Sequence, residues 1–303
     1  MRSALVLPSR GIGDGLLMMI ASQALYLAGY RVTTVHPALL ELKEWFPNHN
    51  FAKEIPSSLE EWDLIIAEND NSPKIQNLKS EREKSRLPIS IFYPTYLEKK
   101  HGALHALDQS FDPSSSFAEN ASRAISKLLQ KERASKDNGI RPPHHLTHRH
   151  YHERILIHPM SSSPQKNWTK ERYIALACSL KKRGVSPVFI VSPEERSSWL
   201  EVESAGFPLP HFSTLSSLAE FTYESHALIG NDSLMGHLAS NLGLPTTILA
   251  DDPKRMQLWR PDWTPSTVIT PPSWIPNPKW LRLRKNRWQQ FISVSRALRS
   301  LSV

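Results

Sequence analysis

The chain has 303 residues, of which 40% are hydrophobic, and it carries a formal net charge of +8. This length and composition suit two globular domains and exclude a low-complexity or fibrous protein. No apolar run approaches the roughly 20 residues of a membrane helix, and the positive charge favours an anionic partner such as a nucleotide, a phosphorylated glycan or a membrane surface.

The first 140 residues alternate strand-like and helix-like segments. Residues 4–8 form a short apolar run, which Pro8 and Arg10 end too soon for a secretory signal, so we expect a buried strand there. The alternation implies parallel strands with crossover helices, and hence an N-terminal Rossmann-like domain over residues 1–140. Its other predicted elements are a helix at 14–27 capped by Asp14, strands at 31–36, 62–67 and 89–93, and a helix at 117–131.

A segment of different composition, residues 141–153, predicts a linker. It is rich in proline and histidine. The histidines could form a metal site, but no cysteine or pair of carboxylates completes one, and we expect a solvated linker. The five histidines are His144, His145, His148, His150 and His152.

The second half repeats the alternation and predicts another doubly wound α/β domain over residues 154–278. Two such domains leave a central cleft at the carboxyl ends of their sheets, where α/β folds bind ligands. Cys178, the only cysteine, lies on a predicted helix, where we expect a buried structural thiol; its lack of a disulfide partner favours the cytoplasm. The predicted strands are 154–158, 187–191, 227–230 and 245–250, and the predicted helices are 170–183, 194–204, 215–224 and 233–242.

The last 25 residues, 279–303, are basic, and no Asp or Glu follows Asp262. We predict a closing helix over Trp280–Leu301. Three interpretations stay open: a solvated charged face, a face drawn to anionic lipid, and a helix that packs back on the first domain.

A glycine-rich turn joins the first predicted strand to the first predicted helix. Gly11 and Gly13 match a dinucleotide-binding fingerprint, but Leu16 occupies the third glycine position and His36 stands where an acidic ribose-binding residue is expected. We therefore reject the fingerprint, which weakens the case for a nicotinamide oxidoreductase. The carboxylate of Asp14 could accept a proton from a hydroxyl group, and a plain helix cap is its alternative role.

A hydroxyl-rich loop follows the strand at 154–158. Ser161 and Ser162 could surround phosphate oxygens, and Lys166 could stabilise the charge that grows on a departing nucleoside diphosphate. An exposed surface loop is the alternative.

A polar turn also precedes the helix at 233–242. Asp232 and Ser233 stand where a helix N-terminus can hold a phosphate or diphosphate, and His237 follows one turn later. A capping pair with a packed histidine is the alternative. We expect Asp251 and Asp252 to serve a turn or a cap rather than a metal.

Taken together, these turns resemble those of glycosyltransferase family 9, the ADP-heptose:lipopolysaccharide heptosyltransferases and their relatives. The resemblance extends over nearly the whole chain. It rests on Gly13-Asp14, on His158-Pro159 through Lys166-Asn167-Trp168, on Asn231-Asp232-Ser233 with His237-Leu238-Ala239, on Gly243-Leu244-Pro245-Thr246 and on Trp259-Arg260-Pro261.

The resemblance implies a GT-B fold, with two facing Rossmann-like domains and no metal or other cofactor. It implies that Asp14 is the general base and that Glu194 or Glu195 lies near the donor ribose. One departure is Leu234, which replaces the glycine that follows Asp-Ser in the family. The donor diphosphate would be held by Ser161, Ser162, Lys166, Asp232, Ser233 and His237.

The function that follows is inverting transfer of a sugar, such as heptose from ADP-heptose, to a lipid-linked core glycan. The protein would be cytoplasmic, with peripheral contact with the inner membrane. The alternative, which Leu234 favours, is a catalytically weak or inactive member that binds nucleotide or glycan as a scaffold. Nucleic-acid binding rests on charge alone, and we expect none.

Overall fold

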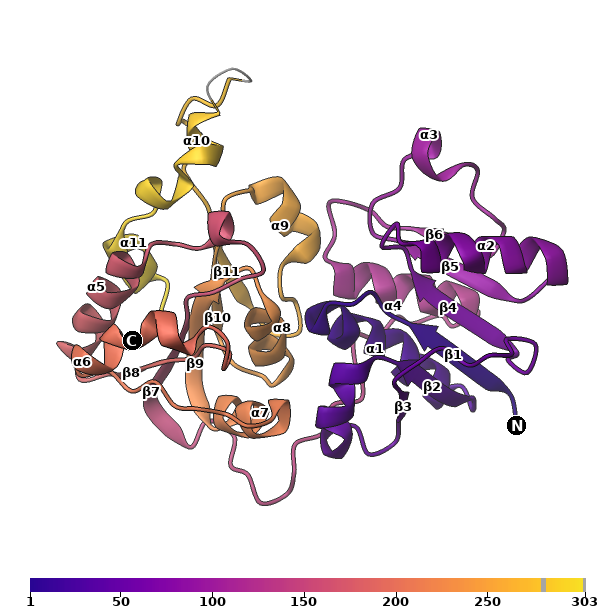
Figure 1. Cartoon of the computed structure of the whole chain (residues 1–303), viewed down its shortest axis with the longest axis horizontal. Coiled ribbons are helices and arrows are strands. Elements are labelled where there is room, and N and C mark those ends of the chain that lie inside the picture. The colour runs from indigo at the N-terminus through magenta and orange to yellow at the C-terminus, as the bar shows by residue number, and fades with distance from the viewer. Residues whose placement is uncertain (279–281, 302–303) are drawn as a thin grey trace. The chain divides into compact units, whose positions relative to one another are not determined.

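The computed structural model describes residues 1–278 and 282–301. Contacts between residues divide the chain into two compact units, Met1–Arg141 and Pro142–Val303. Each unit contains one parallel sheet and the helices that cover it (Figure 1).

The sheet of the first unit has six strands in the order β3-β2-β1-β4-β5-β6, and every neighbouring pair is parallel. β1 and β5 are buried along their whole length, as expected of strands covered on both faces. The strands are β1 (Ser3–Leu7), β2 (Arg31–Val35), β3 (Asn50–Ala52), β4 (Leu64–Glu68), β5 (Ile89–Tyr93) and β6 (Gln109–Ser110).

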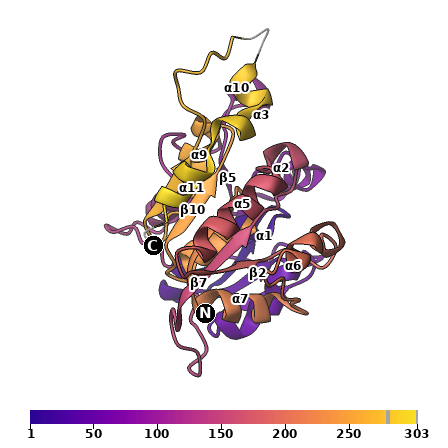
Figure 2. The same cartoon turned by 90° about the vertical axis from the view of Figure 1, so that its left-hand side faces the viewer.

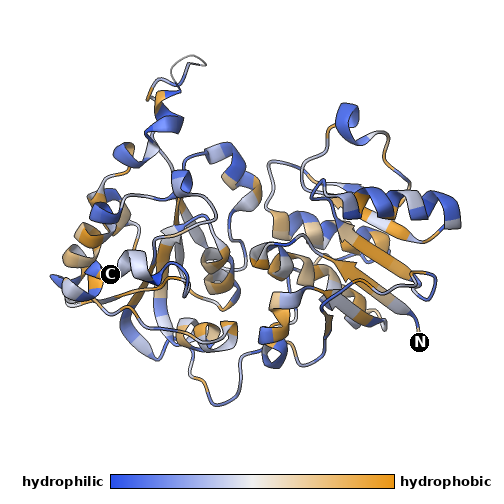
Figure 3. Ribbon diagram, in the orientation of Figure 1, coloured by the Kyte–Doolittle hydropathy of each residue, from blue (hydrophilic) through white to orange (hydrophobic). Residues whose placement is uncertain are grey.

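Helices cover both faces of this sheet. α1 (Ile12–Leu27) packs against α4 (Phe117–Leu128), and α2 (Pro73–Ser85) contributes Ile75 and Leu78 to the core beneath β1 and β4. The strands are largely hydrophobic, whereas α2 is mostly hydrophilic (Figure 3). The remaining helices are the 3₁₀ helix η1 (Pro37–Trp45) and the short α3 (Glu98–His101).

The sheet of the second unit has five parallel strands in the order β11-β10-β9-β7-β8. They are β7 (Tyr151–His158), β8 (Ser186–Phe189), β9 (Ser225–Asn231), β10 (Thr246–Leu249) and β11 (Ser266–Ile269). The helices between them are η2 (Pro164–Lys166), α5 (Lys170–Lys181), η3 (Arg196–Trp199), α6 (Glu201–Ser204), α7 (Leu215–Tyr223), α8 (Leu234–Asn241) and α9 (Pro253–Trp259).

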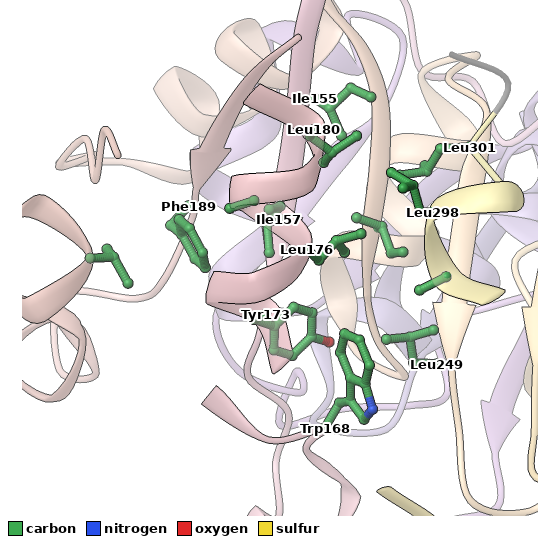
Figure 4. Packing of buried hydrophobic residues seen from close by; sticks show 14 of the residues in the cluster. Ile155, Ile157, Trp168, Tyr173, Leu176, Leu180, Phe189, Leu249, Leu298 and Leu301 are labelled. Carbon is green, nitrogen blue, oxygen red and sulfur yellow. The ribbon is translucent and has the colours of Figure 1, made fainter. Parts of the chain in front are cut away.

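The last described residues complete the core of the second unit. α11 (Val294–Arg299) packs alongside α5 (Figure 2), and Leu298 and Leu301 join Trp168, Tyr173 and other apolar side chains (Figure 4). The predicted single helix over 280–301 is wrong, because the segment consists of α10 (Leu283–Asn286), η4 (Trp288–Phe291) and α11. The buried apolar side chains of this part of the chain belong to the core of the second unit. Lys279 and Trp280 lie outside the described residues.

Three further expectations need correction. Cys178 is exposed on the outer side of α5, so it is not a buried structural thiol. β7 begins at Tyr151, three residues inside the predicted linker, because it pairs with β9 from Ser225 onward. The predicted helix at 194–204 is two short helices, η3 and α6, preceded by a turn at Glu194 and Glu195.

No helix in residues 1–278 or 282–301 has the length and apolar character needed to cross a bilayer.

Candidate functional site

Both sheets place polar loops at the point where their strand order reverses. In the first unit the order reverses between β1 and β4, and in the second between β7 and β9. Ligands of open α/β sheets bind at such switch points, beyond the carboxyl ends of the strands. The glycine-rich turn follows β1, and the two donor-loop candidates follow β7 and β9, so all three motifs lie at these positions.

Asp14 lies in the first turn of α1, and the capping position before the helix is Gly11. The prediction that Asp14 caps the helix is therefore wrong. Its Oδ2 accepts a hydrogen bond of 2.6 Å from the Ser9 hydroxyl. A Cβ at Gly11 would lie 2.5 Å from the same oxygen, so this approach needs glycine. The carboxylate is thus held beside the positive end of a helix, which favours its ionised form.

Beside Asp14 lies a second carboxyl group, that of Glu68 at the end of β4. Glu68 is 2% exposed, and its Oε2 accepts the backbone N–H of Ser9 at 3.0 Å. Burial, and then the charge of Asp14, raise the pKa of Glu68 to about 8. No sequence motif could have identified this residue, since it simply ends an apolar strand.

Two basic groups border this pair of acids. Lys74 on α2 donates from Nζ to the carbonyl of Pro8 at 2.8 Å, and burial lowers its pKa. His36 donates from Nε2 to the carbonyl of Gly11 at 3.1 Å, and burial lowers its pKa below the ordinary value. The turn after β1 is therefore held by two side chains from other elements.

In the second unit, Asn231 joins the loops that follow β7 and β9. Its side chain is fully buried at the end of β9. The Oδ1 atom accepts the Trp168 N–H at 3.0 Å and the Tyr173 hydroxyl at 2.9 Å, while Nδ2 donates to the carbonyl of Pro159 at 2.5 Å. One side-chain amide thus provides hydrogen-bond partners for residues before and after the loop that carries Lys166. These bonds hold the loop in place.

The serines and the lysine predicted to bind the diphosphate lie on this loop. The Ser161 hydroxyl donates to Asn167 Oδ1 at 2.7 Å, Ser162 is exposed, and Lys166 is half-buried at the end of η2. The loop therefore carries hydroxyl and ammonium groups just beyond the carboxyl end of β7.

The C-terminal segment supports this loop from behind. Trp288 is 1% exposed and its Nε1 donates to the carbonyl of Gln165 at 2.8 Å. Trp168 Nε1 in turn lies 3.2 Å from the carbonyls of both Gln289 and Ile292. Sequence reasoning missed this contact, because the partners are more than 120 residues apart.

Asp232 follows Asn231 and forms an ion pair of 3.2 Å with Arg255. The same guanidinium lies 2.8 Å from Asp251, so one arginine is shared between two acids. Asp252 caps α9 by accepting the N–H groups of Lys254 and Arg255, which confirms the capping role expected of it. Arg255 was not singled out from the sequence, because only folding brings it beside Asp232.

Ser233 occupies the capping position before α8. Its hydroxyl oxygen is buried and, within the described part of the chain, has no hydrogen-bond partner. The first N–H groups of a helix also lack partners inside the helix. This combination suits an anion with several oxygens, such as a phosphate.

Leu234 is the first residue of α8. Gly236, two residues later, allows α8 to pack closely against its neighbours. A Cβ at Gly236 would lie 2.6 Å from Ile248 and 3.2 Å from Pro261, so glycine lets α8 approach β10. His237 is 6% exposed, with its ring 6.3 Å from that of Trp263.

The two acids expected near the donor ribose follow β8. Glu195 Oε2 accepts the N–H of Ser192 at 3.0 Å and so stabilises the turn. Glu194 is exposed, and hydrogen bonds to its own backbone N–H and to Ser192 lower its pKa. Among the residues that the structure describes, no group of three His, Cys, Asp or Glu side chains could hold a metal ion.

Known structures show the same architecture over the whole chain. Escherichia coli ADP-heptose lps heptosyltransferase II is 17% identical, with 99% of this chain and 97% of that chain covered and a TM-score of 0.71. A family 9 glycosyl transferase from Veillonella parvula is 18% identical, with 99% and 96% covered and a TM-score of 0.72. The E. coli heptosyltransferase WaaC, solved with ADP, is 15% identical, with 99% and 98% covered and a TM-score of 0.62.

The family model of glycosyltransferase family 9 (heptosyltransferase) matches residues 79–270. No curated protein matches the chain. The matched range runs from α2 to the end of β11, and so includes every loop of the second switch point. The chain therefore belongs to glycosyltransferase family 9, and its two parallel α/β sheets have the GT-B fold of the heptosyltransferases.

Proposed function

We propose that this glycosyltransferase moves heptose from ADP-heptose to a lipid-linked core glycan, with inversion at the anomeric carbon. The donor side rests on one observation: the Ser233 hydroxyl at the tip of α8 is buried and has no hydrogen-bond partner among residues 1–278 and 282–301. It lies at the same switch point as the Lys166 loop. The E. coli WaaC structures with ADP and with ADP-2-deoxy-2-fluoro heptose support a donor of this class.

In this proposal the second unit binds the donor. Ser162 and Ser233 donate to diphosphate oxygens, and Ser161 does so by exchanging its hydrogen bond to Asn167 for one to the ligand. Lys166 stabilises the charge that grows on the leaving group. Asp232, which is paired with Arg255, and His237 shape the site around the helix tip. Of the two acids after β8, we assign the ribose contact to Glu194, because its side chain is exposed whereas that of Glu195 is half-buried.

The first unit supplies the base. Asp14 takes the proton of the acceptor hydroxyl while the oxygen attacks the anomeric carbon, and the bond to the diphosphate breaks with its electron pair leaving on the nucleotide. A single displacement inverts the configuration. The ionised form that this role needs is favoured by the start of α1 and by the Ser9 hydroxyl.

The test is transfer from ADP-heptose to a deacylated core acceptor. We expect Asp14→Ala to lower kcat by about 10²- to 10⁴-fold, as for the loss of a general base. Glu41→Ala, an exposed site on η1, is the control and keeps wild-type rates. Undiminished turnover in both Asp14→Ala and Lys166→Ala would refute the mechanism.

A second candidate is a nucleotide-binding or glycan-binding protein without turnover. Leu234 favours it, because a side chain at the tip of α8 narrows the backbone approach to a diphosphate. Calorimetry separates the candidates: ADP binding with no product in the transfer assay supports this one, and Leu234→Gly should then create or raise turnover.

We also propose peripheral contact with the anionic cytoplasmic face of the inner membrane, close to a lipid-linked acceptor. Trp274 is 79% exposed, and Arg284 donates from its guanidinium to the carbonyl of neighbouring Ser273 at 3.1 Å. An exposed tryptophan among cations is typical of an interfacial anchor, worth about 1 kcal/mol per basic residue near anionic lipid. Arg282 and Lys285 add two exposed charges.

Co-sedimentation with vesicles tests this contact. We expect binding to phosphatidylcholine vesicles that contain phosphatidylglycerol, weaker binding at high salt, and loss of binding in Trp274→Ala or Lys285→Glu. Lys99→Glu, an equally exposed lysine of the first unit, is the control. Equal binding to neutral and anionic vesicles would contradict the proposal.

A further inference from the structure

Ser9 connects two carboxyl groups that belong to different elements. Its hydroxyl donates to Asp14 at 2.6 Å and its backbone N–H donates to Glu68 at 3.0 Å. β1 and β4 are neighbours, with Leu7 paired to Ala67, so the residues that follow them are necessarily close. The pairing of these strands therefore brings Ser9 and Glu68 together.

The two carboxyl groups have different surroundings. Glu68 is 2% exposed, whereas Asp14 is half-buried at the positive end of α1. Two neighbouring carboxylates cannot both ionise without mutual repulsion, and the more buried of the two keeps the proton. The proton therefore resides on Glu68 and the charge on Asp14.

Other charged groups around the pair do not remove this asymmetry. From α2, Lys74 faces Glu68 and lowers its pKa, but less than burial and Asp14 raise it. The charge of Lys74 is itself shared with Asp70 and opposed by Arg10, and its ammonium is bound to the carbonyl of Pro8. The charges of Asp14 and Lys74 also act on His36, where Asp14 raises its pKa and Lys74 lowers it.

We propose that Glu68 is a positioning residue, which holds a proton and acts through Ser9 to keep Asp14 oriented and ionised as the base of the transfer reaction. The role in transfer rests on the proposed function, whereas the shared proton does not. Glu68 touches neither substrate in this scheme. Glu68 affects the reaction only through Ser9, whose backbone N–H it accepts and whose hydroxyl donates to Asp14.

The first experiment needs no catalysis. In protein with ¹³C-labelled glutamate side chains, one resonance should titrate near pH 8, and it should vanish in Glu68→Gln. In Asp14→Asn the same resonance should titrate at lower pH, because the neighbouring charge is gone. Glu81→Gln, an exposed site on α2, is the control and leaves it unchanged. A Glu68 resonance that titrates at the ordinary value, or ignores Asp14→Asn, overturns the shared proton.

The second experiment tests the consequence for transfer. We expect Glu68→Ala to lower kcat by about tenfold or more without changing KM, because Ser9 and Asp14 lose their fixed geometry. Glu68→Gln should restore much of that loss at pH 7, since its amide oxygen still accepts the Ser9 N–H, but should remove the inflection near pH 8 from the rate profile. An unchanged inflection in Glu68→Gln would overturn the positioning role. Absence of transfer even in the wild type would instead refute the proposed function and leave the NMR result standing.

Discussion

At the scale of single residues, Asn231 organises the donor loops although it touches no part of the proposed chemistry. Its amide accepts two hydrogen bonds and donates one to Pro159, all inside the fold. The burial of Tyr173 raises the pKa of that phenol well above its ordinary value, so its hydroxyl remains a donor to Asn231 at any physiological pH.

We therefore expect Asn231→Ala to be among the more costly single changes in the second unit. Leaving several buried partners unsatisfied costs roughly 1–3 kcal/mol each, so the free energy of unfolding should fall by at least about 2 kcal/mol. Urea unfolding measures it. Asn286→Ala, exposed on α10, is the matched control, with an effect of about 0.5 kcal/mol or less. Equal effects of the two changes would contradict the role of Asn231.

Glu68 gives a pH dependence of stability. Its pKa in the folded chain, about 8, is above the value of an exposed glutamate. As pH rises from about 4.5 to 8, the unfolded chain ionises this group while the folded chain keeps the proton, so the folded state loses stability relative to the unfolded state. The slope is at most about 1.4 kcal/mol per pH unit.

Comparing the wild type with Glu68→Gln isolates the contribution of Glu68 to the pH dependence of stability, because the other titrating groups are common to both proteins. Urea unfolding at pH 5 and pH 7.5 should show the wild type losing on the order of 2 kcal/mol more than the variant. A parallel pH dependence in the two proteins would mean that Glu68 is ionised in the folded state.

The sequence predicted the loops of the site better than the contacts inside it. Motifs located Asp14, Lys166 and Ser233 at turns between strands and helices, and the structure places all three at switch points. The sequence motifs did not identify Glu68 and Arg255, because the partners of these residues come from other strands and loops. Whether the singled-out residues bind the donor stays a prediction.

At the scale of elements, most predicted strands agree with the observed ones within one or two residues, but β7 begins three residues before its predicted start, and β3, β6, β11 and the polar helix α2 were not predicted. α2 was missed because only one narrow face of it is apolar, and Ile75 and Leu78 carry most of that face. The closing segment was wrongly predicted as one helix. Its basic and apolar residues do alternate, but Arg282 and Arg287 adopt non-helical backbone angles that divide it.

The segment Trp288–Ile292 should affect donor binding through the loop that it supports. Trp288→Phe keeps an aromatic ring in the core but removes the hydrogen bond to the Gln165 carbonyl. A bond of this kind contributes about 1 kcal/mol, so we expect ADP affinity to fall by about fivefold. Calorimetry measures it, with Trp274→Phe at an exposed site of the same part of the chain as the control.

At the scale of the whole molecule, the two units divide the proposed work. Each has its own core and its own switch point, and the candidate base and the candidate donor loops are in different units. Fold class was therefore predictable from the alternation of strands and helices alone. Strand order was not, because it depends on which strands pair after collapse.

This division predicts separable defects. Lys166→Ala should weaken ADP binding by roughly tenfold or more, since a charge-assisted hydrogen bond contributes about 1.5–3 kcal/mol. Asp14→Asn should leave ADP affinity as it is and affect only transfer. Titration calorimetry of both variants decides the matter; a large loss of ADP affinity in Asp14→Asn would contradict the division.

The support that Trp288 gives to the Lys166 loop also sets an order of events during synthesis. Gln165 leaves the ribosome 123 residues before its partner Trp288. The first unit can fold while translation continues, as N-terminal domains commonly do, but the Lys166 loop gains this support only when the final stretch of the nascent chain has been made. Premature termination just before that stretch would yield a polypeptide with a complete first unit and an unfinished second unit.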